Sequence, residues 1–152
     1  FVGLGSPYWV PEARGAIFGI TRGTTAAELA RAALEGVAFQ VRDLIDAARK
    51  DLGTSLESLR VDGGMAANDW FLQCQADTLG LPVLRSPFGE STALGAAMLA
   101  SIGCGMRKGE NDLKGIVTEA KRFEPKLPEA ERQARLRHWR RAIQEVTTMS
   151  VT

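Results

Sequence analysis

Apolar residues recur at steps of three and four over residues 25–51, which predicts a long amphipathic helix. Thr25 and Glu28 have the spacing of a capping box at its start, and Gly53 can supply the left-handed residue that ends it. The stripe expected to face the core consists of Leu34, Val37, Val41, Leu44, Ile45 and Ala48.

Three short apolar runs predict buried strands because each is bounded by glycine, proline or polar residues. The first covers residues 15–21, in which Ile17, Phe18 and Ile20 are expected to be buried. The second lies within residues 59–64 and runs into two glycines, and the third lies within residues 81–86.

Two further helices follow the glycine pair. Asn68 is a plausible N-cap for a helix that runs through Leu79 and is closed by Gly80. Its inward side chains are predicted to be Phe71, Cys74 and Leu79, and its outward ones Gln73, Gln75 and Asp77. Ser91 or Thr92 can cap the next helix, which ends near Gly103 and whose many small side chains favour tight packing on a sheet.

The end of the chain is predicted to hold a polar connection followed by one more helix. Residues 106–128 read as irregular structure, punctuated by prolines. A helix over about residues 129–147 follows, with Leu136, Trp139, Ile143 and Val146 as its buried stripe and its arginines mostly on a solvated face.

Alternating strands and helices indicate an α/β layer in which the second and third strands are parallel and joined by a helical crossover. Three strands make a thin sheet, since sheets commonly have about four to six. The chain also begins at Phe1 rather than at a methionine. We therefore expect a piece of a longer protein, with further strands of the sheet outside it.

Composition excludes several classes of protein. The 152 residues carry 19 basic and 18 acidic side chains, so no overall field favours nucleic acid or an anionic membrane. No apolar run approaches the roughly 18 residues that span a bilayer. Cys74 and Cys104 have neither disulfide nor zinc spacing, and the single histidine, His138, has no metal-binding neighbours. A reduced, cytoplasmic compartment is the default expectation.

The glycine pair is the main candidate site. Gly63 and Gly64 stand between the end of a strand and the start of a helix, where α/β sheets bind anionic ligands. Taken alone, a glycine pair more often forms a tight strand-to-helix turn without a ligand, since conformational freedom is the commonest use of glycine. Asn68 can cap the helix, contact a ligand or do both, whereas Asp62 reads more simply as a turn former. No side chain stands out as a general base.

Five stretches, taken in order, resemble the C-terminal domain of the FGGY carbohydrate kinases, in particular their glycerol kinase branch. These stretches are FVGLGSPYW, ARGAIFGITRGT, LEGVAFQVRDLIDA, RVDGGMAANDWFLQCQADTLGLPVLRS and TALGAAMLA. Val10 departs from the pattern, because the glycerol kinases usually have an aspartate after PYW.

The resemblance implies an actin-like ATPase (ribonuclease H-like) domain that is incomplete, with the first strands of its sheet missing. It also implies a kinase that uses ATP and Mg²⁺ to phosphorylate glycerol. Gly64 and Asn68 would then contact ATP or ADP, with Gly63 holding the turn. The catalytic aspartate, the glycerol pocket and most of the metal site would precede Phe1, so no catalytic or metal-binding residue is assigned in this chain.

For domain organisation we expect a partial actin-like domain over residues 1–105, and a connecting segment with a packed C-terminal helix over residues 106–152. The expected partners are glycerol, a nucleotide and further copies in a homo-oligomer, with no nucleic acid and no membrane. The chain alone is expected to be inactive and not to fold securely as a monomer. The alternatives are another FGGY kinase of the xylulose or gluconate type, and a non-catalytic binding or assembly module.

Overall fold

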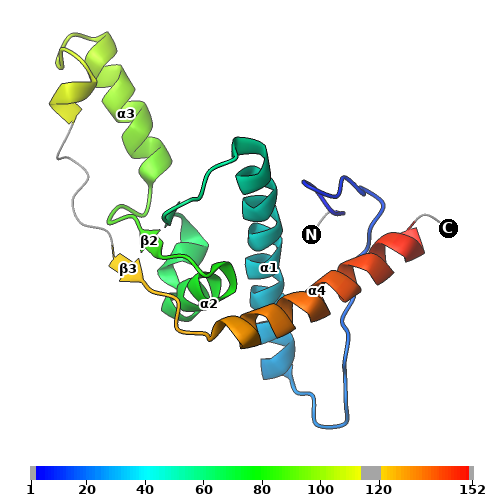
Figure 1. Cartoon of the computed structure of the whole chain (residues 1–152). Helices are drawn as coiled ribbons and strands as arrows, with labels where there is room; N and C mark the ends of the chain where they lie inside the picture. Colours follow the sequence, from blue (N-terminus) through cyan, green and yellow to red (C-terminus); the bar gives the residue numbers. More distant parts are fainter. Residues whose placement is uncertain (1–2, 114–120, 151–152) are drawn as a thin grey trace.

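The computed structural model describes residues 3–113 and 121–150. Figure 1 shows a small sheet beside α2, with α1 and α4 crossing next to it and α3 reaching away from the other helices. In chain order the elements are α1 (Ala26–Leu52), β1 (Leu59–Val61), the 3₁₀ turn η1 (Gly64–Ala67), α2 (Asp69–Leu79), β2 (Val83–Arg85), α3 (Ser91–Gly103), the 3₁₀ turn η2 (Glu110–Leu113), β3 (Lys121–Phe123) and α4 (Glu129–Ser150).

Helix α1 begins and ends as its sequence predicts. The backbone N–H of Ala27 donates to Oγ1 of Thr25 at 3.2 Å, and Oε2 of Glu28 accepts from the Thr25 backbone at 2.9 Å. Gly53 ends the helix with φ of 65°. Most of the apolar stripe packs on the core, but the prediction for Leu44 is wrong: it is 48% exposed, because no described segment covers that side of α1.

The crossover from β1 through α2 to β2 is confirmed. The two strands are parallel, with Leu59 opposite Val83 and Val61 opposite Arg85. Strand β3 pairs antiparallel with β2, and Phe123 stands opposite Val83. The expectation of irregular structure over residues 106–128 was therefore wrong at β3, because a three-residue strand is too short to show alternation in its sequence. Residues 114–120 of that range lie outside the described residues.

The main core lies between α1, α2 and the sheet. Its fully covered members include Ala38, Leu72, Ala76, Leu79 and Val83. Gln75 was expected to point outward, but it is buried. Three- and four-residue steps join it to Leu72 and Leu79, so it shares their inward face, and its Oε1 atom has no partner in the described part of the chain.

A second apolar cluster joins the start of the chain to α4. Leu4, Ala13 and Ile143 are its buried members, and Trp139 packs against them. Reciprocal backbone hydrogen bonds of 2.8 Å between Leu4 and Val10 close the N-terminal loop. The predicted apolar stripe of α4 is confirmed, and the helix extends past the expected end to Ser150.

The predicted strand over residues 15–21 is absent. Ile17, Phe18 and Ile20 are 59%, 53% and 62% exposed, respectively. A strand needs a neighbour to satisfy its backbone, and none of the described strands lies beside this segment. Among the described residues, the apolar run therefore has no strand partner.

Helix α3 forms over the predicted residues but does not pack on the sheet. None of its residues is buried, and Leu99 is 71% exposed. Neither Ser91 nor Thr92 caps it: Glu90 precedes the helix, and no side chain makes a cap hydrogen bond. The hydroxyl of Ser91 instead lies 2.9 Å from Oγ of Ser86, within the loop that leads into the helix.

Candidate functional site

The turn after β1 has a backbone that favours glycine at its first position. Gly63 has φ of 87° and ψ of −178°, a region that is essentially restricted to glycine. Gly64 then opens η1, in which the backbone N–H of Ala66 donates to Gly63 O at 3.0 Å and that of Asn68 donates to Met65 O at 3.1 Å. The turn is thus internally bonded and stands directly before α2.

Gly64, unlike Gly63, does not have a backbone conformation that favours glycine. Its φ lies outside the left-handed region, and a Cβ atom built on it would meet nothing within 4 Å. Neither backbone strain nor a packed neighbour therefore requires glycine at this position. The missing side chain leaves bare backbone facing open space, which is the geometry that a closely approaching ligand needs.

Asn68 has two polar groups with different uses. Its Oδ1 atom accepts from the backbone N–H of Phe71 at 3.1 Å, so the side chain caps α2 as predicted. Its amide NH₂ has no partner among residues 3–113 and 121–150, and the residue is exposed. One side chain can therefore hold the helix start and still offer two N–H donors to a ligand.

Asp62 lies beside the turn, in the wall of a pocket of about 290 Å³. The pocket opens where β1 and β2 end and the first turns of α3 begin. Its other lining residues are Arg60, Val61, Leu84, Ser86, Pro87, Phe88, Ser91, Leu94, Gly95 and Met98. Gly63, Gly64 and Asn68 do not line this pocket. Those three residues belong to the adjoining turn η1 and its two ends, whereas Asp62, the residue just before the turn, lies in the pocket wall.

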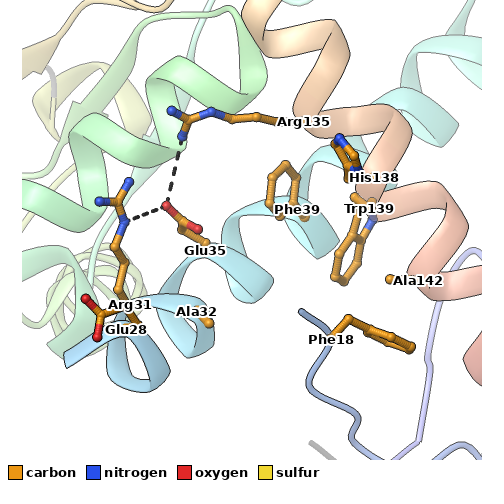
Figure 2. Close-up of a pocket in the computed structure, with 10 residues that line it drawn as sticks. All are labelled: Phe18, Glu28, Arg31, Ala32, Glu35, Phe39, Arg135, His138, Trp139 and Ala142. Atoms are coloured by element: carbon orange, nitrogen blue, oxygen red, sulfur yellow. Dashed lines mark hydrogen bonds and ion pairs between the residues drawn. The ribbon is translucent and has the colours of Figure 1, made fainter. Parts of the chain in front are cut away.

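A larger pocket, of about 540 Å³, lies between α1, α4 and Phe18 (Figure 2). Glu35 accepts from Nε of Arg31 at 2.8 Å and lies 3.9 Å from Nη1 of Arg135, and the rings of Phe39 and Trp139 stack at 5.3 Å. His138 lines the pocket but is exposed, as expected of a surface histidine. Three of the charged groups at its rim, those of Arg31, Glu35 and Arg135, pair with one another, which is typical of a packing contact between helices.

Metal-binding and membrane-spanning features are absent from the part of the chain that the structure describes. Within that part, no three His, Cys, Asp or Glu side chains gather closely enough to hold a metal ion. Cys74 is half-buried and Cys104 is exposed, and both are free thiols. None of the described helices is long and apolar enough to cross a bilayer.

Comparison with known proteins defines the class. Residues 1–104 match the C-terminal domain of the FGGY family of carbohydrate kinases, and the chain belongs to that family. The predicted fold class, an α/β domain of the actin-like ATPase type, agrees with this match and with the small mixed sheet seen here.

Among individual relatives, glycerol kinases stand out. The chain is 52% identical to the glycerol kinase of Deinococcus radiodurans and 55% identical to that of Thermus brockianus, over 94% and 95% of its length. It covers only 28% and 29% of those two proteins.

Solved structures allow a comparison between the branches of the family. A Plasmodium falciparum glycerol kinase with ADP superposes with a TM-score of 0.84 at 32% identity, over 96% of this chain and 29% of that one. A xylulose kinase from Rhodospirillum rubrum superposes less well, with a TM-score of 0.72 at 26% identity, over 96% of this chain and 31% of that one. The glycerol kinase branch is therefore favoured over the other sugar kinases.

Proposed function

We propose that this chain is the nucleotide-binding C-terminal part of a kinase that transfers the γ-phosphate of ATP to glycerol. The observation that carries the proposal is the bare turn at the end of β1, where Gly64 leaves backbone open for no reason internal to the chain. The likeness to a glycerol kinase whose structure was determined with ADP supports a nucleotide as the ligand of such a turn.

Each residue of the turn has a distinct role in this proposal. Gly63 adopts the conformation that sets the direction of the turn, and Gly64 lets the nucleotide approach the backbone. Asn68 donates an amide N–H to the nucleotide while its oxygen continues to cap α2. Phosphoryl transfer depends mainly on positioning and on charge stabilisation, so rigid contacts to the nucleotide contribute directly to it.

The chemical groups that act on glycerol are proposed to lie elsewhere in a full-length kinase. Mg²⁺ neutralises developing phosphate charge when it is bound, but the described residues hold no cluster that fits it. We therefore assign no catalytic residue or metal ligand here, and we propose that the 152-residue chain does not phosphorylate glycerol on its own.

The remaining parts of the proposal concern organisation. Residues 1–105 would form the nucleotide-binding part, with residues 106–152 as the connecting segment and the packed C-terminal helix. We also propose that the parent kinase assembles into a homo-oligomer, in which exposed apolar residues such as Phe18 and Leu99 are covered by other parts of the protein or by further copies. We further propose that the parent kinase acts in the cytoplasm.

The experiment that tests this function replaces Asn68 by serine in the purified chain. Serine is about as good an N-cap as asparagine, so α2 should keep its start, but the NH₂ donor is lost. We expect ADP affinity, measured by isothermal titration calorimetry, to fall about tenfold, the loss typical of a hydrogen bond of about 1.4 kcal/mol. The melting temperature should stay unchanged.

Asn111→Ser is the matched control, because Asn111 is exposed and lies in η2, in a different part of the chain. It should bind ADP like the wild type. Unaltered ADP affinity in Asn68→Ser, or no binding by the wild-type chain, would contradict the proposed site. Glycerol-dependent formation of ADP from ATP by the purified chain would contradict the proposed inactivity.

A further inference from the structure

The far end of the glycine turn is held by a side chain from the neighbouring strand. Nη1 of Arg85, the last residue of β2, donates to the carbonyl oxygens of Ala66 at 3.1 Å and Ala67 at 3.4 Å. The same nitrogen donates to Oδ1 of Asp69, the first residue of α2, at 2.7 Å. One guanidinium group therefore joins the end of η1 to the start of α2 on both sides of Asn68.

A second cation completes this arrangement from β3. Nζ of Lys121 lies 2.5 Å from Oδ2 of Asp69, so the two oxygens of one carboxylate bind two different strands. Lys121 stands directly opposite Arg85 in the antiparallel register. Both cations lie over the ring of Phe123, at 5.8 Å for Arg85 and 5.3 Å for Lys121.

The ionisation of Asp69 favours its contacts with Arg85 and Lys121. The hydrogen bond from Lys121, with burial opposing it and Arg85 adding to it, keeps the pKa of Asp69 below its ordinary value. Asp69 therefore stays ionised and bound to both cations at neutral pH. A carboxylate in the first turn of α2 is also favoured by the helix dipole.

We infer that Arg85 and Lys121 act through Asp69 as positioning residues that hold the Gly63–Asn68 turn in the conformation that binds nucleotide. This inference rests on the proposed function, because the ligand is taken to be the nucleotide proposed above. Lys121 lies outside the family match over residues 1–104, so a segment beyond that match contributes to the nucleotide site.

The exposed fractions of the two side chains indicate which cation contributes more to holding the turn. The side chain of Arg85 is 26% exposed, against 51% for Lys121, and Arg85 also binds two backbone carbonyls. Exposed ion pairs are weak and are screened by salt, whereas the hydrogen bond from Arg85 to the carbonyl of Ala66 is part-buried and therefore less screened. We call the contacts of Arg85 and Lys121 with Asp69 and the end of the turn the clamp. Arg85 is its main element, and Lys121 is a smaller one whose contribution high salt should weaken.

Two measurements test the clamp in the full 152-residue chain. The first is hydrogen exchange of the Ala66 and Asn68 backbone amides, which close η1, compared with the Gly80 amide at the far end of α2. The second is ADP affinity. Arg85→Gln should speed exchange at Ala66 and Asn68 about tenfold without changing Gly80, the effect of losing about 1.4 kcal/mol of local stability. The same variant should weaken ADP binding by about five- to tenfold.

Matched variants separate positioning from general stability. Lys121→Met should weaken ADP binding about twofold at low salt, and not at all in about 0.5 M salt. Arg85→Lys should bind ADP more tightly than Arg85→Gln, because it keeps a donor near Asp69. If Arg85→Gln fails to fold, Arg85→Lys takes its place in both measurements. Arg122→Gln is the control, because Arg122 lies on β3 next to Lys121 but pairs with Glu124 instead of Asp69. This variant should leave both amide exchange and ADP affinity unchanged.

The outcomes are distinguishable. Unchanged exchange at Ala66 and Asn68 in Arg85→Gln would overturn the clamp, whether or not the chain binds ADP. Faster exchange with unchanged ADP affinity would overturn its role in positioning the site. If the wild type fails to bind ADP while exchange still responds to Arg85, the proposed function fails and the hold on the turn is upheld.

Discussion

Nε1 of Trp139 donates to Oδ2 of Asp43 at 2.6 Å, a hydrogen bond between α4 and α1 that spans 96 positions of the sequence. The hydroxyl of Tyr8 donates to the same oxygen at 2.8 Å. One carboxylate therefore fastens the N-terminal loop and the last helix to the first helix. Both hydrogen bonds are part-buried, so water competes with them less than it would at the surface.

Replacing Trp139 by phenylalanine should destabilise the chain by about 1 kcal/mol, because the N–H donor is lost. The substituted ring can still stack on Phe39, which lies 5.3 Å from Trp139 in the native chain. Chemical denaturation measures the change in free energy of unfolding. Trp9→Phe is the control, since Trp9 is 74% exposed, and an equal loss in that variant would argue against the hydrogen bond as the cause.

Asp43 should make the stability of the chain depend on pH. Burial raises the pKa of Asp43 above its ordinary value of 3.8, although Trp139 and Tyr8 oppose the shift, with smaller effects from Asp46 and Arg140. The folded state therefore favours the protonated carboxyl. The resulting stabilisation is complete below pH 3.8 and is lost as pH rises through the raised pKa.

Asp43→Asn tests the direction of this pH dependence, because an amide cannot ionise. Its deficit in unfolding free energy relative to the wild type should be larger at about pH 4 than at about pH 7. Denaturation of both chains at the two pH values gives the difference, in which the other titrating groups largely cancel. A deficit that grows toward pH 7 would show that the ionised carboxylate is the favoured form.

Gly80→Ala should destabilise the chain by about 1–3 kcal/mol, because φ is 63° and an L residue is strained there. A Cβ atom would also stand 2.0 Å from Nη1 of Arg132, whose side chain would have to move. Arg132→Ala combined with Gly80→Ala separates the two causes. If Arg132 contributes to the cost, the double variant is more stable than the sum of the single variants predicts.

Gly36→Ala should have the opposite effect, because Gly36 lies in the interior of α1 and a Cβ atom would meet nothing within 4 Å. Alanine is the better helix former, so a gain of about 0.5–1 kcal/mol is expected in thermal or chemical unfolding. Gly53→Ala on the same helix serves as the contrast, since its φ of 65° predicts a loss. A loss at Gly36 would point to a neighbour that requires glycine there.

Elements with local signals were predicted from the sequence. The cap and stop residues of α1 and α2 are encoded within a few positions of each helix end, and both were correct. The segment over residues 15–21 and the packing of α3 were wrong because both depend on a neighbour that the described chain does not supply. Hydrophobicity indicates that a segment is suited to burial, but burial also requires a partner.

The candidate site was predictable only in part. Gly63, Gly64 and Asn68 lie close together in sequence, and the structure places them on one turn, although their contact with a nucleotide stays a prediction. Arg85 and Lys121 carried no signal, since their approach to Asp69 depends on the register of β2 with β3. An arginine at the end of a predicted parallel strand is the only sequence feature that could have pointed to the clamp.

The crossover from β1 to β2 has a consequence for how the chain folds. Its strands, its turn and α2 are contiguous over residues 59–85, so their contacts close short loops and can form early. Strand β3 must close a longer loop before it pairs with β2, and α4 follows it. We therefore expect the glycine turn and its main hold, Arg85, to form early during folding, whereas Lys121 adds its smaller contribution only when β3 pairs with β2.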